Sequence, residues 1–337
     1  EVAEKISKEI IENNGLISKS DLKKYNPIWR DPLISNYRDT KVITMGPPSS
    51  GGLHVIQMLN ILENYDLNKI GHNSSEYINL LAEVMKYAYA DRSKYLGDPD
   101  FYEVPIRKII SKEYANEISK NIEIGKLRPA KQIHPGKFMR KESHETTHFS
   151  VVDKQGNVVS MTYTLNSTFG SKVVIEGTGI LMNNEMDDFS AAPGVPNQFN
   201  LLGAEANEIA PFKRPLSSMT PTIVLKNDEL FFTTGSPGGA RIISAVLQSI
   251  LNIIDFNMNL EDTTLAKRIH HQWYPDILEY EFTLDKKIED DLKKIGYKTS
   301  SKLPLTSLQT IMFADGIYYG YGDFRRVDAL ASGKIYD

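Results

Sequence analysis

Two short segments constrain the fold most strongly. Residues 145–153 read ETTHFSVVD, a run of strand formers whose first threonine lies where a cut in the chain would make it a new N-terminus. A later segment, TGSPGGA at residues 234–240, sets two glycines between a predicted strand and a predicted helix. Backbone N–H groups at such a helix start can hold a developing oxyanion. Together the segments favour an amidase-type enzyme with a threonine nucleophile.

Composition removes several other classes of protein. The 337 residues suffice for one large or two ordinary domains, and 41% apolar and 24% charged residues with a net charge of -4 are typical of a soluble globular protein without a nucleic-acid-binding footprint. The absence of cysteine excludes disulfides, thiolate zinc sites and a cysteine nucleophile. No apolar run approaches the ~20 residues that span a bilayer. The opening residues lack a basic-then-apolar leader, so we expect no secretion signal within this chain.

The first 130 residues are predicted to be mainly helical. An amphipathic helix with Val2, Ile6 and Ile10 on one face is expected to open the chain and to end near residues 13–15, and residues 37–44 are predicted to form a strand. This strand stops at GPPSSGG, residues 46–52, which are all turn formers. Apolar residues at helical spacing follow, so a helix is expected to start at that loop.

A β-hairpin is predicted where the sequence changes from helical patterns to strand-forming residues. From Thr146 onward, strand formers flank KQG at residues 154–156, a three-residue connection with glycine where a left-handed residue is needed. If Asp153 faces Asn157, Thr146 lies opposite Thr164, although a bulge at the glycine would shift this register by one.

A second hairpin is predicted from residues 222–225 and 230–234. It leads the chain to Gly238 and Gly239, after which a helix with a broad apolar stripe begins. Hairpins flanked by such helices predict sheets covered by helices on their outer faces. No linker separates independent domains, so one structural domain is expected.

Thr146 is the first candidate for catalysis. A threonine hydroxyl needs an adjacent base, and after chain cleavage its own α-amine, with a pKa of roughly 7.7 to 8.0, can serve as that base. Gly238 and Gly239 would hold the oxyanion. The alternatives are an ordinary strand threonine and a tight turn that needs glycine. A phosphate loop is disfavoured because its Gly-Lys-Ser/Thr ending is missing.

Two polar clusters are candidate binding sites. In residues 183–190, Glu185 and Asp188 could grip a substrate ammonium, but they could also form a solvated turn or bind calcium. Ser217 and Ser218, flanked by prolines, could bind a carboxylate or belong to a loop without function. The histidines, His148 among them, are interpreted as structural because they lack metal-ligand spacing.

Taken in order, seven segments resemble the γ-glutamyltranspeptidase family of N-terminal-nucleophile hydrolases. They are residues 47–52, 87–92, 96–101, 146–148, 183–190, 215–220 and 235–240. The resemblance implies an α/β (α+β) fold, a four-layer αββα sandwich. It also implies autocatalytic cleavage before Thr146. Residues 1–145 would then be the C-terminal part of the large subunit, and residues 146–337 the small subunit that carries the nucleophile.

The resemblance also implies the chemistry. Thr146 would attack the γ-glutamyl amide of glutathione or a similar donor and pass the glutamyl group to an amino acid, a peptide or water, without a cofactor or metal. The implied site residues are Thr164 beside the nucleophile, Gly238 and Gly239 as the oxyanion hole, Asn166, Glu185 and Asp188 for the donor's α-amine, and Ser217 and Ser218 for its α-carboxylate.

Two further features bear on this interpretation. Residues 193–199 resemble the lid over the glutamyl pocket, with Phe199 where many bacterial members have tyrosine; a lid argues against the related cephalosporin acylases and capsule depolymerases. The resemblance omits the N-terminal portion of the large subunit, which normally supplies an arginine for the substrate carboxylate. By analogy the enzyme would be periplasmic or secreted. The alternatives are an acylase of the same fold and a binding protein that is never processed.

Overall fold

The chain's structure is a computed structural model that describes residues 1–134, 147–190, 201–304 and 306–334. Its centre is a six-stranded antiparallel sheet. In spatial order the strands are β1 (Leu33–Tyr37), β2 (Thr40–Thr44), β7 (Thr222–Lys226), β8 (Glu229–Thr234), β12 (Gln309–Ala314) and β13 (Ile317–Gly322). The segments before residue 135 and after residue 146 thus share one sheet.

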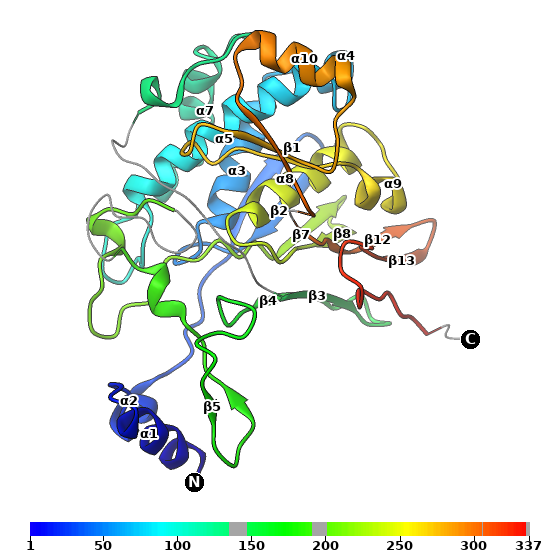
Figure 1. Ribbon diagram of the computed structural model, residues 1–337. Helices are drawn as coiled ribbons and strands as arrows, with labels where there is room; N and C mark the ends of the chain where they lie inside the picture. Colours follow the sequence, from blue (N-terminus) through cyan, green and yellow to red (C-terminus); the bar gives the residue numbers. More distant parts are fainter. Residues whose placement is uncertain (135–146, 191–200, 305, 335–337) are drawn as a thin grey trace.

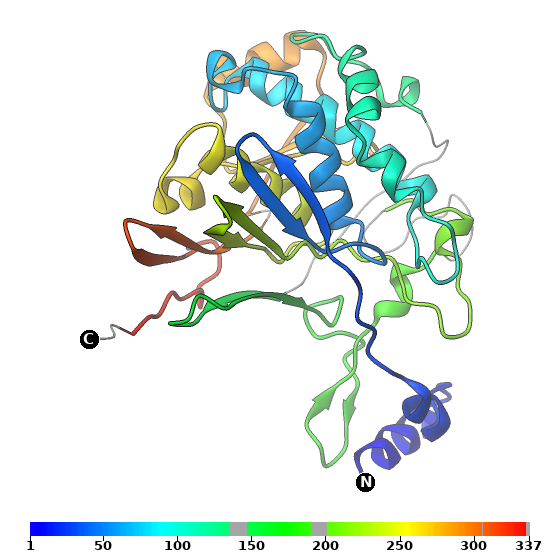
Figure 2. The ribbon, with the colours of Figure 1, turned by 180° about the vertical axis from the view of Figure 1, so that it is seen from behind.

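Helices cover one face of this sheet (Figures 1 and 2). The innermost are α3 (Gly51–Leu62), α5 (Ser75–Tyr95) and α8 (Arg241–Ile254). Every residue of α3 is buried, and most of its apolar side chains join those of α5 and α8 in the main core. The other helices are α1 (Val2–Glu12), α2 (Lys19–Lys24), α4 (Leu67–Ile70), α6 (Ile106–Ile109), α7 (Lys112–Ser119), α9 (Leu260–Leu265) and α10 (Lys286–Ile295), with 3-10 turns η1 (Ala130–Gln132), η2 (Glu185–Asp188) and η3 (Glu205–Asn207).

The predicted hairpin lies against the opposite face of the sheet (Figure 1). It consists of β3 (Thr147–Val152) and β4 (Val158–Tyr163), and the Ser150 hydroxyl donates to the Gln309 carbonyl at 3.0 Å. Thr147 pairs with Tyr163, and the Asp153 N–H donates to the Asn157 carbonyl, so the predicted register is confirmed over the described residues. Gly156 has a φ of 82°, the left-handed conformation expected of it.

The two faces of this hairpin have the reverse of the usual polarity. The face against the sheet carries His148, Ser150, Ser160 and Thr162. The outer face carries five apolar side chains that are 37–53% exposed: Phe149, Val151, Val159, Met161 and Tyr163. The described residues therefore form a helical layer, a full sheet and one hairpin of a second sheet, whose outer face is uncovered by any described element.

One local prediction was incomplete. Residues 37–44 were expected to be a single strand, whereas they contain the turn of the β1–β2 hairpin. Arg38, with a φ of 51°, begins this turn in the left-handed conformation. Arginine is not a typical residue for that conformation, so the sequence carries no turn signal there.

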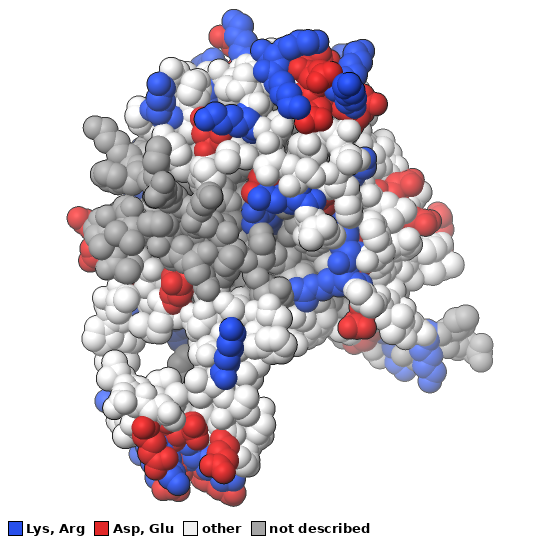
Figure 3. Space-filling view, viewed as in Figure 1, with Lys and Arg blue, Asp and Glu red and all other residues white. Residues whose placement is uncertain are grey.

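Smaller elements complete the description. A three-stranded sheet in the order β11–β10–β9 is formed by Thr299–Lys302, Leu278–Glu281 and Ile269–His270, and a short hairpin by β5 (Val174–Ile175) and β6 (Ile180–Leu181). Acidic and basic side chains gather together over α10 and over α1–α2, at opposite ends of one face (Figure 3). Within the described ranges, no helix has the length and apolar character needed to cross a membrane.

Candidate active site

A cavity of about 340 Å³, its open mouth included, brings most of the predicted site residues together. Its lining contains six of them: Thr164, Asn166, Asp188, Ser217, Ser218 and Gly239. The remaining wall is formed by Arg92, Leu201, Leu216, Met219, Ala240 and Ile242. The twelve lining residues come from six separate parts of the chain, so their convergence is a property of the fold.

Not all predicted residues lie in this lining. Gly238 and Glu185 do not line the cavity, but each is adjacent to a residue that does. Gly238 directly precedes Gly239, and the Glu185 side chain is hydrogen-bonded to Asp188. Thr146, together with Phe199 and the rest of the predicted lid, lies outside the described residues.

The glycine loop adopts the shape that an oxyanion site requires. Gly238 and Gly239 have φ values of 136° and 58°, which favour glycine, and α8 begins two residues later. The Gly239 N–H donates to no acceptor within the described part of the chain. An N–H at a helix start is a site for developing negative charge.

His148 is held directly behind this loop. A Cβ added at Gly235 would lie 2.1–2.5 Å from the His148 ring atoms, so only glycine permits this approach. The ring nitrogens pair with Thr162 Oγ1 at 2.8 Å and Ser150 Oγ at 3.2 Å. Burial lowers the His148 pKa to about 4, so the ring is neutral at neutral pH. These contacts agree with the structural role predicted for His148.

We expect Gly235→Ala to destabilise the protein by about 1–3 kcal/mol, because the buried His148 ring has to move away from the new methyl group. Thermal unfolding measures this loss. Gly333→Ala is the matched control, since no atom lies within 4 Å of that Cβ. Equal melting temperatures for the two variants would contradict the packing described here.

Hydrogen bonds connect Thr164 to the acidic cluster. The Thr164 hydroxyl accepts from the Asn166 N–H at 2.8 Å, and Asn166 takes a left-handed φ of 73°. The Asn166 side chain donates to the Asn184 carbonyl at 3.1 Å, and the Asn184 side chain accepts from the Ser167 N–H at 2.9 Å. Asn184 immediately precedes η2, so this network fixes the acidic turn relative to the end of β4.

Glu185 and Asp188 form a hydrogen-bonded pair of carboxyl groups. Burial, and then the neighbouring Glu185, raises the pKa of Asp188 well above its ordinary value. Burial likewise raises the pKa of Glu185, whose Oε1 is buried without a hydrogen-bond partner. Two desolvated carboxyl groups side by side disfavour double ionisation, and a cationic ligand would relieve this cost. Among the described residues, no cluster of three or more acidic or histidine side chains could hold a metal ion.

The serine pair, Ser217 and Ser218, is held by the loop of residues 47–52. Ser217 exchanges backbone hydrogen bonds with Pro48 and Ser50, at 2.9 and 2.8 Å. Gly51 is required here, because an added Cβ would lie 2.1 Å from Thr220 Oγ1 and 2.7 Å from the Met219 carbonyl. The start of α3 is therefore packed closely against the backbone of residues 218–220.

Three contributors were not predicted: Ser50, Arg92 and Asn207. The buried Asn207 amide donates to the Asp188 carbonyl at 2.7 Å and accepts from the Leu216 N–H at 3.0 Å, which ties the acidic turn to the serine loop. Ser50 and Arg92 lie in two of the segments that resemble the family, but the sequence assigns them no role. Their roles depend on contacts with distant residues that spacing alone does not predict.

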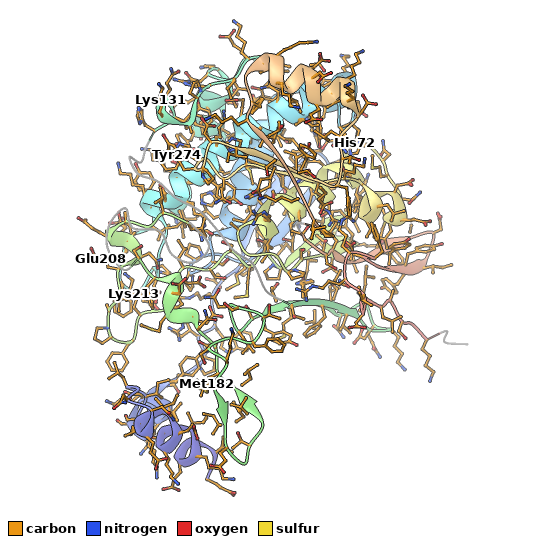
Figure 4. The ribbon with its side chains drawn as sticks, viewed as in Figure 1. His72, Lys131, Met182, Glu208, Lys213 and Tyr274 are labelled. Atoms are coloured by element: carbon orange, nitrogen blue, oxygen red, sulfur yellow. The ribbon has the colours of Figure 1, made fainter. Side chains whose placement is uncertain are left out.

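A smaller cavity of about 220 Å³, its opening included, adjoins the first. Arg92 and Leu201 line both cavities, and the second is completed by Tyr89, Ser93, Leu202, Gln272, Trp273 and Tyr274. Figure 4 labels Tyr274 here, and also Glu208 and Lys213 on the loop that leads toward the serine pair.

The chain is similar to known proteins in sequence and in fold. The family model of gamma-glutamyltranspeptidase matches residues 1–333. The glutathione hydrolase proenzyme of Escherichia coli strain K12 is 50% identical over 333 residues, which are 98% of this chain and 57% of that protein. A cephalosporin acylase from Bacillus halodurans superposes with a TM-score of 0.83 at 26% identity, over 96% of this chain and 57% of that one. A chain of a Helicobacter pylori gamma-glutamyltranspeptidase mutant superposes with a TM-score of 0.52 at 49% identity, over 53% of this chain and 100% of that one.

The similarity to these solved structures assigns the fold of the chain to the class of N-terminal-nucleophile hydrolases, in agreement with the predicted fold class. The match along nearly its whole length is more specific: the chain belongs to the γ-glutamyltranspeptidase family. It spans a little over half the length of the Escherichia coli relative.

Proposed function

We propose that this chain is the part of a γ-glutamyl transferase and hydrolase that contains the nucleophile, and that it acts on glutathione-like γ-glutamyl amides. One observation carries the proposal: the lining of a single cavity combines the carboxyl group of Asp188 and the amide of Asn166 with the serine pair Ser217 and Ser218 and a glycine, Gly239, at a helix start. A γ-glutamyl group presents an ammonium, a carboxylate and a reacting carbonyl, so each of these three kinds of group has a chemical match on the donor.

The proposed reaction begins after cleavage before Thr146. The freed α-amine takes the proton of the Thr146 hydroxyl while Oγ attacks the donor's γ-carbonyl carbon. The N–H groups of Gly238 and Gly239 stabilise the resulting oxyanion. The C–N bond then breaks, the leaving amine takes the proton, and a γ-glutamyl ester remains on Thr146. An amino acid, a peptide or water attacks this ester, and its proton returns through the amine to the threonine oxygen. The Thr164 hydroxyl is proposed to assist the amine.

We further propose a processed heterodimer in which residues 1–145 belong to the large subunit and residues 146–337 form the small one. A further portion of the large subunit is proposed to complete the pocket with a carboxylate-binding arginine. The exposed apolar outer face of the β3–β4 hairpin supports such a partner, because five apolar side chains on one sheet face favour burial against other protein. We propose a location outside the cytoplasm.

Mass analysis and an activity assay test this function. Assembled enzyme is expected to consist of two fragments and to release the amine from γ-glutamyl anilides. A chain that stays intact on prolonged incubation would favour a non-catalytic binding protein. Processed enzyme that is inactive on γ-glutamyl anilides but cleaves another amide would favour the acylase, an alternative supported by the cephalosporin acylase similarity.

The carboxyl pair predicts the pH dependence of donor binding. A carboxyl group with a raised pKa remains neutral to a higher pH, and only its ionised form attracts the donor's ammonium. The KM for the donor should therefore fall as pH rises through the raised pKa of Asp188. Glu185→Gln removes the like charge, lowers that pKa and should shift this fall to lower pH. The exposed Glu176→Gln is the control. Superimposable profiles for the Glu185 variant and the unmodified enzyme would contradict this assignment.

A further inference from the structure

Arg92 connects the end of α5 to the serine loop. It lies in the last turn of the helix and is only 3% exposed. Its Nε donates to Ser50 Oγ at 2.9 Å, and its Nη2 donates to Ser218 Oγ at 3.0 Å. The planar guanidinium therefore spans two hydroxyls from segments that are far apart in the sequence.

The bond from Arg92 decides which role the Ser218 hydroxyl plays toward the guanidinium. A guanidinium has donors only, so Ser218 Oγ must act as the acceptor in this bond. The Ser218 hydroxyl proton goes to no acceptor within the described part of the chain, and the residue lines the cavity. The Ser218 proton is thus available to an anion in the cavity.

The neighbouring serines show that this arrangement is selective. Ser50 also accepts from Arg92, but its own proton goes to the Ser217 carbonyl at 2.8 Å. Ser217 Oγ accepts from the Met219 N–H at 3.1 Å, and so, like Ser218, it retains a proton for the cavity. The hydroxyls of Ser217 and Ser218 can therefore each donate a proton to a ligand in the cavity. The buried Ser50 cannot, because it donates its proton to the Ser217 carbonyl.

The positive charge of Arg92, like the serine hydroxyls, favours an anion in the cavity. Its field partly opposes the raised pKa of Asp188, so the cation lies within electrostatic reach of the acidic wall. The cavity lining therefore contains a cation, Arg92, next to Ser218, and also the carboxyl group of Asp188. This matches an α-amino acid, whose carboxylate and ammonium are adjacent.

We propose that Arg92 is a positioning residue for the carboxylate of an α-amino acid donor. Through Ser218 it fixes a hydroxyl proton toward the cavity, and through Ser50 it holds the serine loop on α3. Lysine cannot reproduce this geometry, because a single ammonium lacks the planar fork that reaches both oxygens. The inference rests on the proposed function and deepens it.

The test compares two substrates in the assembled enzyme: the γ-glutamyl anilide and the 4-aminobutyryl anilide, which lacks only the α-carboxylate. Arg92→Lys and Arg92→Gln should each raise the KM for the γ-glutamyl anilide by about 10- to 100-fold with little change in kcat. The KM for the 4-aminobutyryl anilide should remain within about 3-fold, since no carboxylate is lost. Arg107→Gln, which changes an exposed residue of α6, is the control and should match the unmodified enzyme on both substrates.

A double-mutant cycle tests the route through Ser218. If Arg92 acts through that hydroxyl, Arg92→Lys should add little to the KM increase caused by Ser218→Ala. Equal KM increases for the two substrates, unchanged KM values, or full additivity with Ser218→Ala would each overturn the inference.

Calorimetric measurement of L-glutamate and 4-aminobutyrate binding tests the role of Arg92 without turnover. Weaker binding of L-glutamate alone to the Arg92 variants would support the inference even in an inactive preparation. If unmodified enzyme neither hydrolyses the γ-glutamyl anilide nor binds L-glutamate, the proposed function fails and the inference with it. If the unmodified enzyme does both and the Arg92 variants do not discriminate between the substrates, only the inference fails.

Discussion

Thr146→Ala is expected to leave the chain uncut and to abolish turnover, a loss on the order of 10⁶-fold. The alanine side chain offers no nucleophile for cleavage, and without cleavage no α-amine is released as base. Thr146→Ser should retain part of both activities, because it preserves the hydroxyl and, after cleavage, the amine. Electrophoresis and anilide turnover measure the two effects separately.

Thr147→Ala is the matched control for this experiment. It changes the adjacent threonine, which is partly exposed at the start of β3 and pairs with Tyr163. Cleavage and turnover should persist in this variant. Two results would show that Thr146 is not the nucleophile. One is wild-type processing of the Thr146→Ala variant, and the other is a complete loss of both activities in Thr147→Ala alone.

Asp188→Ala is expected to weaken donor binding by about 2–5 kcal/mol, because it removes a desolvated charge partner of the donor's ammonium. The Asp188 side chain lines the cavity and pairs with Glu185, while its backbone carbonyl is held by Asn207. Asp188→Asn keeps the shape and should lose nearly as much affinity. Calorimetric titration of the Thr146→Ala protein with L-glutamate measures binding without turnover.

Asp187→Asn provides the comparison for Asp188. Asp187 lies in the same 3-10 turn but is exposed and does not line the cavity. Its replacement should change donor affinity little. Equal affinities of the Asp188→Ala variant and the unmodified protein for L-glutamate would contradict this role. They would support the alternative interpretation that the acidic cluster is a solvated turn.

Local patterns predicted the hairpins well. Alternating residues and Gly156 defined the β3–β4 register, because side-chain period and turn geometry leave few alternatives. The second hairpin was also predicted; it turns at Asn227 and Asp228, both at positive φ. The β1–β2 turn was missed because Arg38 adopts that conformation without being a residue that favours it.

The site was predictable in kind but not in its construction. Local patterns identified the acidic pair, the serine pair and the glycine loop, yet each had a plain structural alternative. Their convergence in one cavity depends on long-range contacts, such as that of Arg92 with Ser218, which are 126 positions apart. No spacing rule predicts such a pair, so the resemblance to a family indicated the grouping and the fold supplied the geometry.

The most direct test of the account is the N-terminal residue of the smaller fragment in active enzyme. The account predicts a free α-amine on Thr146, found by terminal sequencing of every active preparation. Active enzyme whose Thr146 nitrogen is still in a peptide bond, or whose smaller fragment begins at another residue, would contradict it, because the proposed chemistry would then have no base.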